Sequence, residues 1–280
     1  MNSRHRHIYS LVVALVATGC VVPVEQHRAH FDQTWPAATI RHVEVHEVMG
    51  TIDVEAGSPD RVQMSADVRA RTDANRSKQY EGYFTTDVVG DTLVIGTVRR
   101  HRHFVIGFWN SDDVRIDYHL RVPPEVALDL QTVNGRIETR DIAGETRATT
   151  INGEIDLECT GANEVAARAV NGRVAARFLN DFHGAQFKTV NGRVIATLPQ
   201  NASFLGDFAQ VNGDFEAAFP LNIHSNPGSR HVSGEVNGGR YPLKITTVNG
   251  DIKVDNGPAA PAPAAPPAPP ATPAPPAPRT

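Results

Sequence analysis

A three-residue pattern, an aliphatic residue followed by Asn-Gly, recurs along the second half of the chain and constrains its fold more than any other feature. Successive asparagines of the pattern are 18, 19, 20, 21 and 37 residues apart. A fixed period near 19 residues is typical of proteins built from stacked structural repeats. The asparagines are Asn134, Asn152, Asn171, Asn191, Asn212 and Asn249.

The longest interval, from Asn212 to Asn249, is about twice the others. The sequence HVSGEVNGG, residues 231–239, lies near its middle, and we interpret it as a degenerate copy of the repeat. Before the repeats the sequence is less regular but still strand-like. Gly50 and Ile52 stand there at the spacing of another degenerate copy.

Alignment of the copies on their asparagines shows which positions repeat. The residue directly before Asn, the fourth before it and the third after it are apolar in every copy, whereas the second after it is always charged. Alternation after the turn predicts a strand with one buried face and one wet face. We expect the apolar positions on both sides of the turn to be interior. The phase slips by one residue before Asn, which predicts a bend just ahead of the turn.

The Asn-Gly turn itself is compatible with two folds. Glycine adopts positive φ at no steric cost, and Asn-Gly between alternating apolar residues is a strong hairpin signal, which predicts an antiparallel meander. Alternatively, each turn is one corner of a solenoid whose coils stack about 4.8 Å apart. Matched residue types at a near-constant period favour the solenoid, because a meander aligns neighbours in reversed order. We therefore predict an all-β fold, a single-stranded β-solenoid of the right-handed β-helix type with an N-terminal β cap.

The N-terminus has the features of an export signal. Arg4 and Arg6 precede an apolar run of about ten residues, shorter than the roughly twenty of a spanning helix. The sequence ATGC, ending at Cys20, resembles the lipobox of bacterial lipoproteins, which implies that Cys20 carries acyl chains that anchor the protein in a membrane. An ordinary secretory signal is the alternative. Val21 stands where inner-membrane lipoproteins have aspartate, which implies an outer-membrane address facing the periplasm.

The C-terminal end consists almost entirely of Ala and Pro. Such a tract cannot form a backbone hydrogen-bond ladder and adopts an extended polyproline conformation. The predicted division of the chain is a signal peptide (1–19), a tether (20–33), an N-terminal β region (34–128), a repeat solenoid (129–255) and a disordered tail (256–280).

Charge and cysteine content exclude some classes of protein. Loss of Arg4 and Arg6 with the signal takes the formal net charge from −4 to −6, the wrong sign for a nucleic-acid binder. With Cys20 acylated, Cys159 is the remaining cysteine, so no disulfide can form within the chain. Cys159 is in phase with Ile155 and Leu157, which predicts a buried core position.

The sequence from VRIDYHL to GEIDL, residues 114–157, resembles the bacterial "putative-adhesin" family of β-strand-repeat lipoproteins. The family pattern is a strand, then Val-Pro, then repeated coils with Thr-x-Asn/Ser-Gly-x-Ile. The resemblance covers roughly residues 40–255. It implies an exported, non-enzymatic β-solenoid of unknown ligand, and it supplies no catalytic or binding residues.

The fourth position after Asn offers candidate chemistry. There Glu138 and Asp156 would be neighbours about 5 Å apart, a separation that suits a retaining glycosidase or a calcium site. The alternative is a wet face on which Arg136 and Arg173 pair with these carboxylates.

A basic segment, VRRHRHFVIGFWNSDD at residues 98–113, offers a second candidate. Its arginines, beside an aromatic pair, could hold an anionic sugar or lipid head group. His101 and His103 share a strand face but lack a fixed third ligand, so we predict no metal site. The candidate ligand-binding residues are Arg99, Arg100, Arg102 and Trp109.

These observations predict a non-catalytic, lipid-anchored cell-envelope protein that acts as an adhesin or scaffold. Its expected partners are the membrane, through the lipid on Cys20, and an envelope polysaccharide or protein. We expect no cofactor and no nucleic acid. The alternative function is a carbohydrate-active enzyme on a β-helix, with Glu138, Asp156 or Glu216 as its carboxylates.

Overall fold

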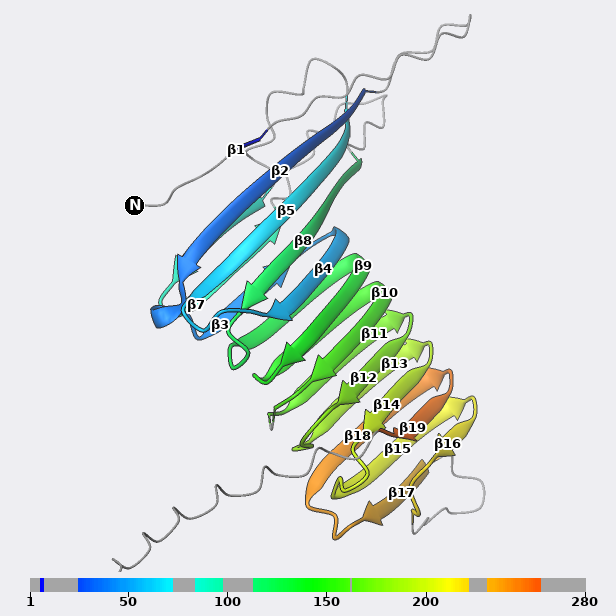
Figure 1. Ribbon diagram of the computed structural model, residues 1–280. Helices are drawn as coiled ribbons and strands as arrows, with labels where there is room; N and C mark the ends of the chain where they lie inside the picture. The colour runs from blue at the N-terminus through cyan, green and yellow to red at the C-terminus, as the bar shows by residue number, and fades with distance from the viewer. Residues whose placement is uncertain are drawn as a thin grey trace, which may run out of the picture.

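The protein is all-β, as predicted (Figure 1). The computed structural model describes residues 6–7, 25–72, 84–97, 113–161, 163–221 and 231–257. Within these ranges the regular structure is strand, apart from one short 3-10 helix, η1 (Ala37–Thr39). The strands before the repeats are β1 (Arg6–His7), β2 (Glu25–Pro36), β3 (His42–His46), β4 (Met49–Ala56), β5 (Arg61–Thr72), β6 (Phe84–Val89), β7 (Thr92–Thr97) and β8 (Asp113–Val122).

The repeats form hairpin-shaped coils, each with two arms joined at an Asn-Gly corner. In β9 and β10 one strand continues through the corner, and in later coils each arm is a separate strand. The strands are β9 (Ala127–Ile142), β10 (Thr146–Cys159), β11 (Val165–Asn171), β12 (Val174–Phe178), β13 (Ala185–Asn191), β14 (Val194–Leu198), β15 (Phe204–Asn212), β16 (Phe215–Ala217), β17 (His231–Val236), β18 (Tyr241–Asn249) and β19 (Ile252–Asn256).

First arms pair with first arms and second arms with second arms, in parallel register. Thr146 of β10 lies beside Val165 of β11, and Ile155 of β10 lies beside Val174 of β12. Like positions of successive coils therefore stand in rows, as a solenoid requires and a meander does not. The corners line one edge of the molecule, which we call the corner edge, and the connections between coils line the opposite loop edge (Figure 1).

The coil that is last in the sequence is not last in the stack. β18 lies between β13 and β15, and β19 lies between β14 and β16. β17 pairs antiparallel with β15 and not in parallel as a coil would. The prediction that residues 231–239 are a degenerate copy of the repeat is therefore wrong. Asn237 and Gly238, both with positive φ, turn the chain across the start of β15 instead. The Asn237 side chain fixes this turn by donating to the Ala202 carbonyl over 2.9 Å.

β3 and β4 form a coil ahead of β9. Met49 takes the asparagine position and Gly50 the glycine position. β7 and β8 continue the two arms in parallel, and β6, β5 and β2 complete this end with antiparallel pairing. β2 starts at Glu25, so strand begins inside the range expected to be a tether. Burial of Ala29 and Trp35 on one face of β2 explains why this segment joins the sheet.

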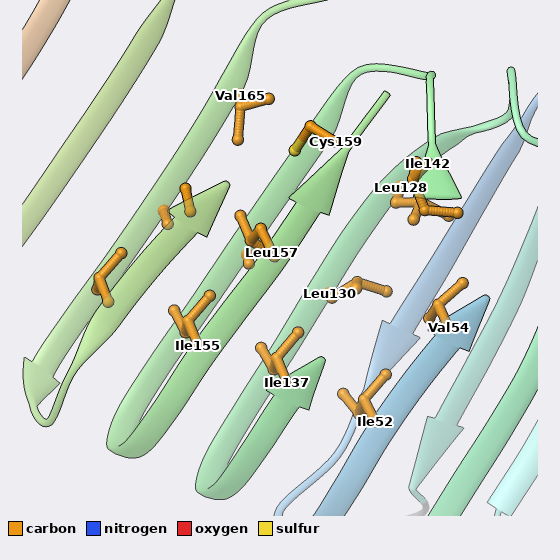
Figure 2. Close-up of a cluster of buried hydrophobic side chains, with 14 of the residues drawn as sticks. Ile52, Val54, Leu128, Leu130, Ile137, Ile142, Ile155, Leu157, Cys159 and Val165 are labelled. Atoms are coloured by element: carbon orange, nitrogen blue, oxygen red, sulfur yellow. The ribbon is translucent and has the colours of Figure 1, made fainter. Parts of the chain in front are cut away.

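Buried side chains fill the space between the two arms (Figure 2). The third residue after Asn is interior as predicted, and Ile137, Ile155 and Val174 are fully buried. Cys159 is buried in phase with Leu157, again as predicted.

One predicted interior position is wrong. The residue directly before Asn is outward-facing, with Ile151 43% and Val211 54% exposed. The residue one place earlier, usually threonine, is buried instead. The phase slip therefore occurs at the corner, where the chain passes from one arm to the other. The buried residues of this column include Thr132, Thr150, Ala169, Thr189 and Thr247.

Close stacking of the corners explains the repeated glycine. A Cβ atom on Gly153 would lie 1.7 Å from the carbonyl oxygen of Gly135, and one on Gly172 would lie 1.7 Å from that of Gly153. The φ of Gly153 is also +154°, which side chains rarely adopt. Each corner must therefore lack a side chain for the next coil to approach.

Candidate functional site

The asparagines form a hydrogen-bonded ladder along the corner edge. The Nδ2 atom of Asn152 donates to Oδ1 of Asn134, and that of Asn171 donates to Oδ1 of Asn152, each over 2.8 Å. The ladder continues through Asn191 and Asn249 at 2.8 and 2.9 Å. Each interior asparagine thus uses one donor and one acceptor on its neighbours, which makes the ladder a structural element that fixes the corners in line.

A row of aliphatic side chains runs beside this ladder on the outer face of the first arms. Four of its members are among the most exposed large hydrophobic residues of the structure, and Val248 is the least exposed of these at 38%. Outward positions on a sheet are usually polar, so a continuous apolar row is unusual. We call it the corner row: Val48, Val133, Ile151, Val170, Val190, Val248 and Val211.

Two cations stand next to the corner row. Arg168 of β11 and Lys188 of β13 are in register on adjacent strands, two residues before Val170 and Val190. Both are exposed, and neither forms an ion pair within the described ranges. Like charges directly opposite each other on a sheet are destabilising, so this pair does not stabilise the fold.

The outer face of the second arms is, by contrast, charge-paired. Arg140 donates to Asp53 over 2.9 Å and to Glu138 over 2.6 Å. The hydrogen bond to Asp53 is the main cause that raises the pKa of Arg140. Further along the stack, hydrogen bonds from Arg193 lower the pKa of Asp251.

The carboxylates considered for chemistry belong to this paired face. Glu138 and Asp156 are in register on β9 and β10, as expected. Asp156 accepts hydrogen bonds from Arg136 over 2.6 Å and from Arg173 over 2.9 Å. Glu216 does not join them, because it lies opposite Lys253 on β19.

A further cluster was missed by sequence analysis. An open depression of about 540 Å³ on the outer face of β2, β4, β5 and β8 includes Asp32 and Ser65. The Ser65 Oγ atom is 3.4 Å from Nε2 of His30, whose Nδ1 is 2.7 Å from Asp67. The alternation of polar and apolar residues in β2 is a signal that places His30 and Asp32 on one face of a strand. The prediction of a tether over residues 20–33 overlooks this signal.

The connectivity of Ser65, His30 and Asp67 is that of a catalytic triad, yet the charges oppose that role. The Nε2 atom of His30 also lies 3.2 Å from the Asp32 carboxylate. The hydrogen bond to Asp67, followed by the charge of Asp32, raises the pKa of His30. When His30 is protonated, both ring nitrogens face carboxylates, and neither can then take a proton from Ser65.

The remaining predicted site residues lie outside the described ranges. These are Cys20 and, in the basic segment, Arg99, Arg100, Arg102 and Trp109. Within the described ranges, no three or more His, Cys, Asp or Glu residues are grouped so that they could hold a metal ion. No described helix is both long and apolar enough to cross a bilayer.

Stacked two-armed coils, a glycine-lined corner edge and rows of like side chains define a β-solenoid of the repeat class. The family described as Toastrack DUF4097 matches residues 39–255, well over half of the chain, and the protein belongs to this family. The resemblance inferred from the sequence is thereby confirmed. No curated protein sequence matches the chain.

Solved structures with a similar arrangement are remote in sequence. A "putative cell adhesion protein" from Clostridium sporogenes is 11% identical, with a TM-score of 0.42, and the match covers 82% of this chain and 100% of that one. A "putative adhesin" from Bacteroides fragilis is 10% identical, with a TM-score of 0.28 and coverage of 80% and 96%. A "putative lipid binding protein" from Parabacteroides distasonis is 10% identical, with a TM-score of 0.27 and coverage of 79% and 96%.

Proposed function

We propose that the protein is a non-catalytic, lipid-anchored envelope protein that adheres to or scaffolds a partner through rows of charged side chains. The observation that carries this proposal is the outer face of the second arms, where the second residue after Asn is charged in every repeat and arginines pair with carboxylates of neighbouring strands. Such a face offers many weak contacts to an extended partner, whose strength comes from their number. An envelope polysaccharide or an extended protein surface has the required shape.

The same face argues against catalysis by its carboxylates. A retaining glycosidase needs one carboxyl group to protonate the leaving group and another to attack the sugar. The oxygens of Glu138 and Asp156 instead accept hydrogen bonds from Arg140, Arg136 and Arg173. These guanidinium groups engage the carboxylate oxygens that would have to face the glycosidic oxygen and the anomeric carbon of a sugar.

Binding of the full-length protein to purified peptidoglycan sacculi and to outer-membrane vesicles tests the proposal. We expect saturable binding to one of these that weakens when Arg136, Arg173 and Arg193 are changed together to Ser. A matched triple change of Arg28, Arg41 and Arg61 to Ser, outside the repeats, should leave binding intact. Equal loss in the two triple variants would contradict adhesion through this face.

Release of reducing ends from the same polysaccharides tests the enzyme alternative. We expect none from the native protein. Turnover that disappears in both Glu138→Gln and Asp156→Asn would replace the adhesin proposal with an enzyme.

The lipid anchor has its own test. Membranes from cells that express the protein are washed with alkali, which strips proteins held only at the surface. We expect the native protein to stay with the membranes and the Cys20→Ala form to be removed. Retention of the Cys20→Ala form after washing would exclude anchoring through Cys20.

A further inference from the structure

We propose that the corner edge is a membrane-docking surface, on which the corner row enters the headgroup region and Arg168 and Lys188 contact anionic lipid headgroups. This inference rests on the proposed lipid anchor at Cys20 and adds to it an orientation. The anchor would hold the protein at the membrane, and the corner edge would determine which side of the protein faces the bilayer.

The first argument is the exposed apolar surface. The half-exposed aliphatic side chains of the corner row together present on the order of 400 Å², the size of the largest apolar patch on a typical monomer, which is often functional. A stable dimer buries about 800 Å² per partner, roughly twice what this row offers. Shallow contact with lipid needs less area when a covalent lipid already holds the protein at the surface.

The second argument is charge. The row next to the corner row contains Arg168 and Lys188 but no carboxylate, and the corner row contains no charged residue. Its members, in stacking order, are His46, Gln131, Thr149, Arg168, Lys188, Thr246 and Ala209.

The corner edge of the first arms is therefore a strip in which two positive charges, without an ion-pair partner among the described residues, stand beside apolar side chains. On the second arms, Arg136, Arg140 and Arg173 each have a carboxylate partner. Anionic headgroups would supply the missing counter-charges, and the long stems of Arg168 and Lys188 can lie over apolar surface while their charged ends reach the phosphates.

The third argument is the place where the chain leaves the fold. β2 runs in the same direction as β8 and β4, because it is antiparallel to β5 and β5 is antiparallel to β8. Since β4 starts at the Met49–Gly50 corner and runs away from it, β2 also starts on the corner side (Figure 1).

The register places this start beyond the corner. Asp32 is level with Asp53 through Ser65 and His119, so Glu25 extends past Met49 by three residues, about 10 Å. Cys20 is five positions before Glu25, and five extended residues reach at most about 18 Å. The lipid on Cys20 would therefore attach to the side of the molecule that carries the corner row.

The test measures the environment of one corner-row residue against a matched position on the same strand. Val211 and Leu205 of β15 are both 54% exposed and lie on the same face, but Leu205 is near the loop edge. Each is changed to Cys in the lipidated full-length protein and labelled with a polarity-sensitive fluorophore. Cys159 should not react, because it is buried.

The labelled proteins are reconstituted into vesicles of phosphatidylethanolamine and phosphatidylglycerol. We expect a blue shift of emission for the label at Val211→Cys and none for the label at Leu205→Cys. Vesicle-bound protein that shows no shift at either position would overturn docking while leaving the lipid anchor intact. Failure of the protein to float with vesicles would instead overturn the anchor, and the docking inference with it.

Two other occupants of the row give distinct results. A shift at Val211→Cys that occurs without vesicles and grows with protein concentration would show a second copy of the chain on this edge and overturn lipid docking. A shift that requires added polysaccharide and not lipid would overturn it in favour of a glycan.

A second experiment isolates the cations with the Cys20→Ala form, in which no acyl chain contributes to vesicle binding. We expect the double change Arg168→Glu and Lys188→Glu to lower partitioning to anionic vesicles by roughly tenfold or more, because each basic residue near an anionic surface contributes a few-fold. The same charge change at Arg41 and Arg61, on the loop edge, is the matched control and should have a much smaller effect. Equal losses in the two double variants would overturn the role of the corner edge.

Discussion

Asn249 donates its side-chain amide to Asn191, 58 residues earlier in the chain, over 2.9 Å. Asn212 in turn donates to Asn249 over 2.8 Å, so the ladder passes from the fourth Asn-Gly corner to the sixth and then back to the fifth. In sequence order, the outermost coil (β15 and β16) and β17 come first. The coil of β18 and β19 follows, and it lies between the outermost coil and the coil of β13 and β14. β17, which precedes the inserted coil in the sequence, pairs antiparallel with β15 and covers the end of the stack.

This insertion predicts which engineered cysteine pairs will form a disulfide. Lys188 is in register with Thr246, and Thr246 with Ala209, so Lys188 and Ala209 are two strands apart. Adjacent strands place Cα atoms within the range that a disulfide spans, whereas two strand spacings, about 9.6 Å, exceed it. We expect oxidation to cross-link Lys188→Cys with Thr246→Cys but not with Ala209→Cys, as measured by mass spectrometry of peptides. A cross-link between Lys188→Cys and Ala209→Cys instead would show that the coils stack in the order of the sequence, with β13 next to β15.

A second prediction concerns the glycine at the corner. Gly153→Ala would place a methyl group against the carbonyl of Gly135 in a backbone conformation that alanine avoids, and we expect a loss of about 3 kcal/mol of unfolding free energy or more. Gly96→Ala is the control, because nothing lies within 4 Å of the added atom there. The measurement is the free energy of unfolding of both variants in urea. Equal, small decreases in the two variants would show that the corners are not tightly stacked.

A third prediction concerns the paired face. Asp156→Asn removes a charge that accepts from Arg136 and Arg173, and we expect a loss of about 1 kcal/mol, reduced because both arginines are more than 40% exposed. Glu216→Gln should be nearly neutral, since it has no ion-pair partner among the described residues. Added salt should shrink the difference between the variants. A salt-independent loss at Asp156 would indicate packing and not charge as its cause.

Local patterns in the sequence predicted what depends on a single coil. The position of Ile155 three residues after Asn predicts its burial, because alternation in one strand is enough. The sequence predicts that Val170 is interior, because hydrophobic residues are usually buried. It does not predict the burial of Thr150, because threonine is polar even though its side chain has the same shape as that of valine. Which residues before Asn are buried depends on how the two arms pack against each other. The sequence of one arm alone does not determine this packing.

Long-range features could not be predicted in the same way. The coil around Asn249 has the same local sequence whether it stacks on Asn191 or on Asn212. The cluster of His30, Ser65 and Asp67 depends on the pairing of β2 with β5, which alternation in either strand does not specify. The pairing of β2 also explains why its sequence resembled a tether, since a strand at the end of a stack buries only one sparse set of apolar residues.

A fourth prediction uses Cys159 as a reporter of unfolding. Burial, helped by the charge of Glu158, raises the pKa of the Cys159 thiol to about 12. Only the thiolate reacts with disulfide reagents, so the native Cys20→Ala protein should not be modified at pH 8. We expect complete modification once the protein is unfolded in urea, with the transition at the same urea concentration as the loss of β signal by circular dichroism. Rapid modification under native conditions would show that the second arm of this coil opens locally.

The last prediction is a pH dependence of stability that arises at His30. Its pKa is raised above 6.5, first by the hydrogen bond to Asp67 and then by the charge of Asp32. A raised pKa means that the folded protein holds this proton more tightly than the unfolded chain. The stabilisation is therefore complete below pH 6.5 and is lost as the pH rises through the folded-state pKa. His30 is 41% exposed in its side chain, which screens the interaction and limits it to about 0.5 kcal/mol.

The comparison that isolates this effect is the native protein against His30→Gln at two pH values. At pH 5.5 the native protein should be more stable than the variant by the full amount, and at pH 9 the two should be nearly equal. The measurement is the free energy of unfolding in urea, with Asp67→Asn as a second variant that removes the main partner. A difference that is the same at both pH values would mean that His30 contributes by packing and hydrogen bonding in its neutral form. In that case Nε2 would be free to accept a proton, and the objection to a catalytic role for Ser65 would no longer hold.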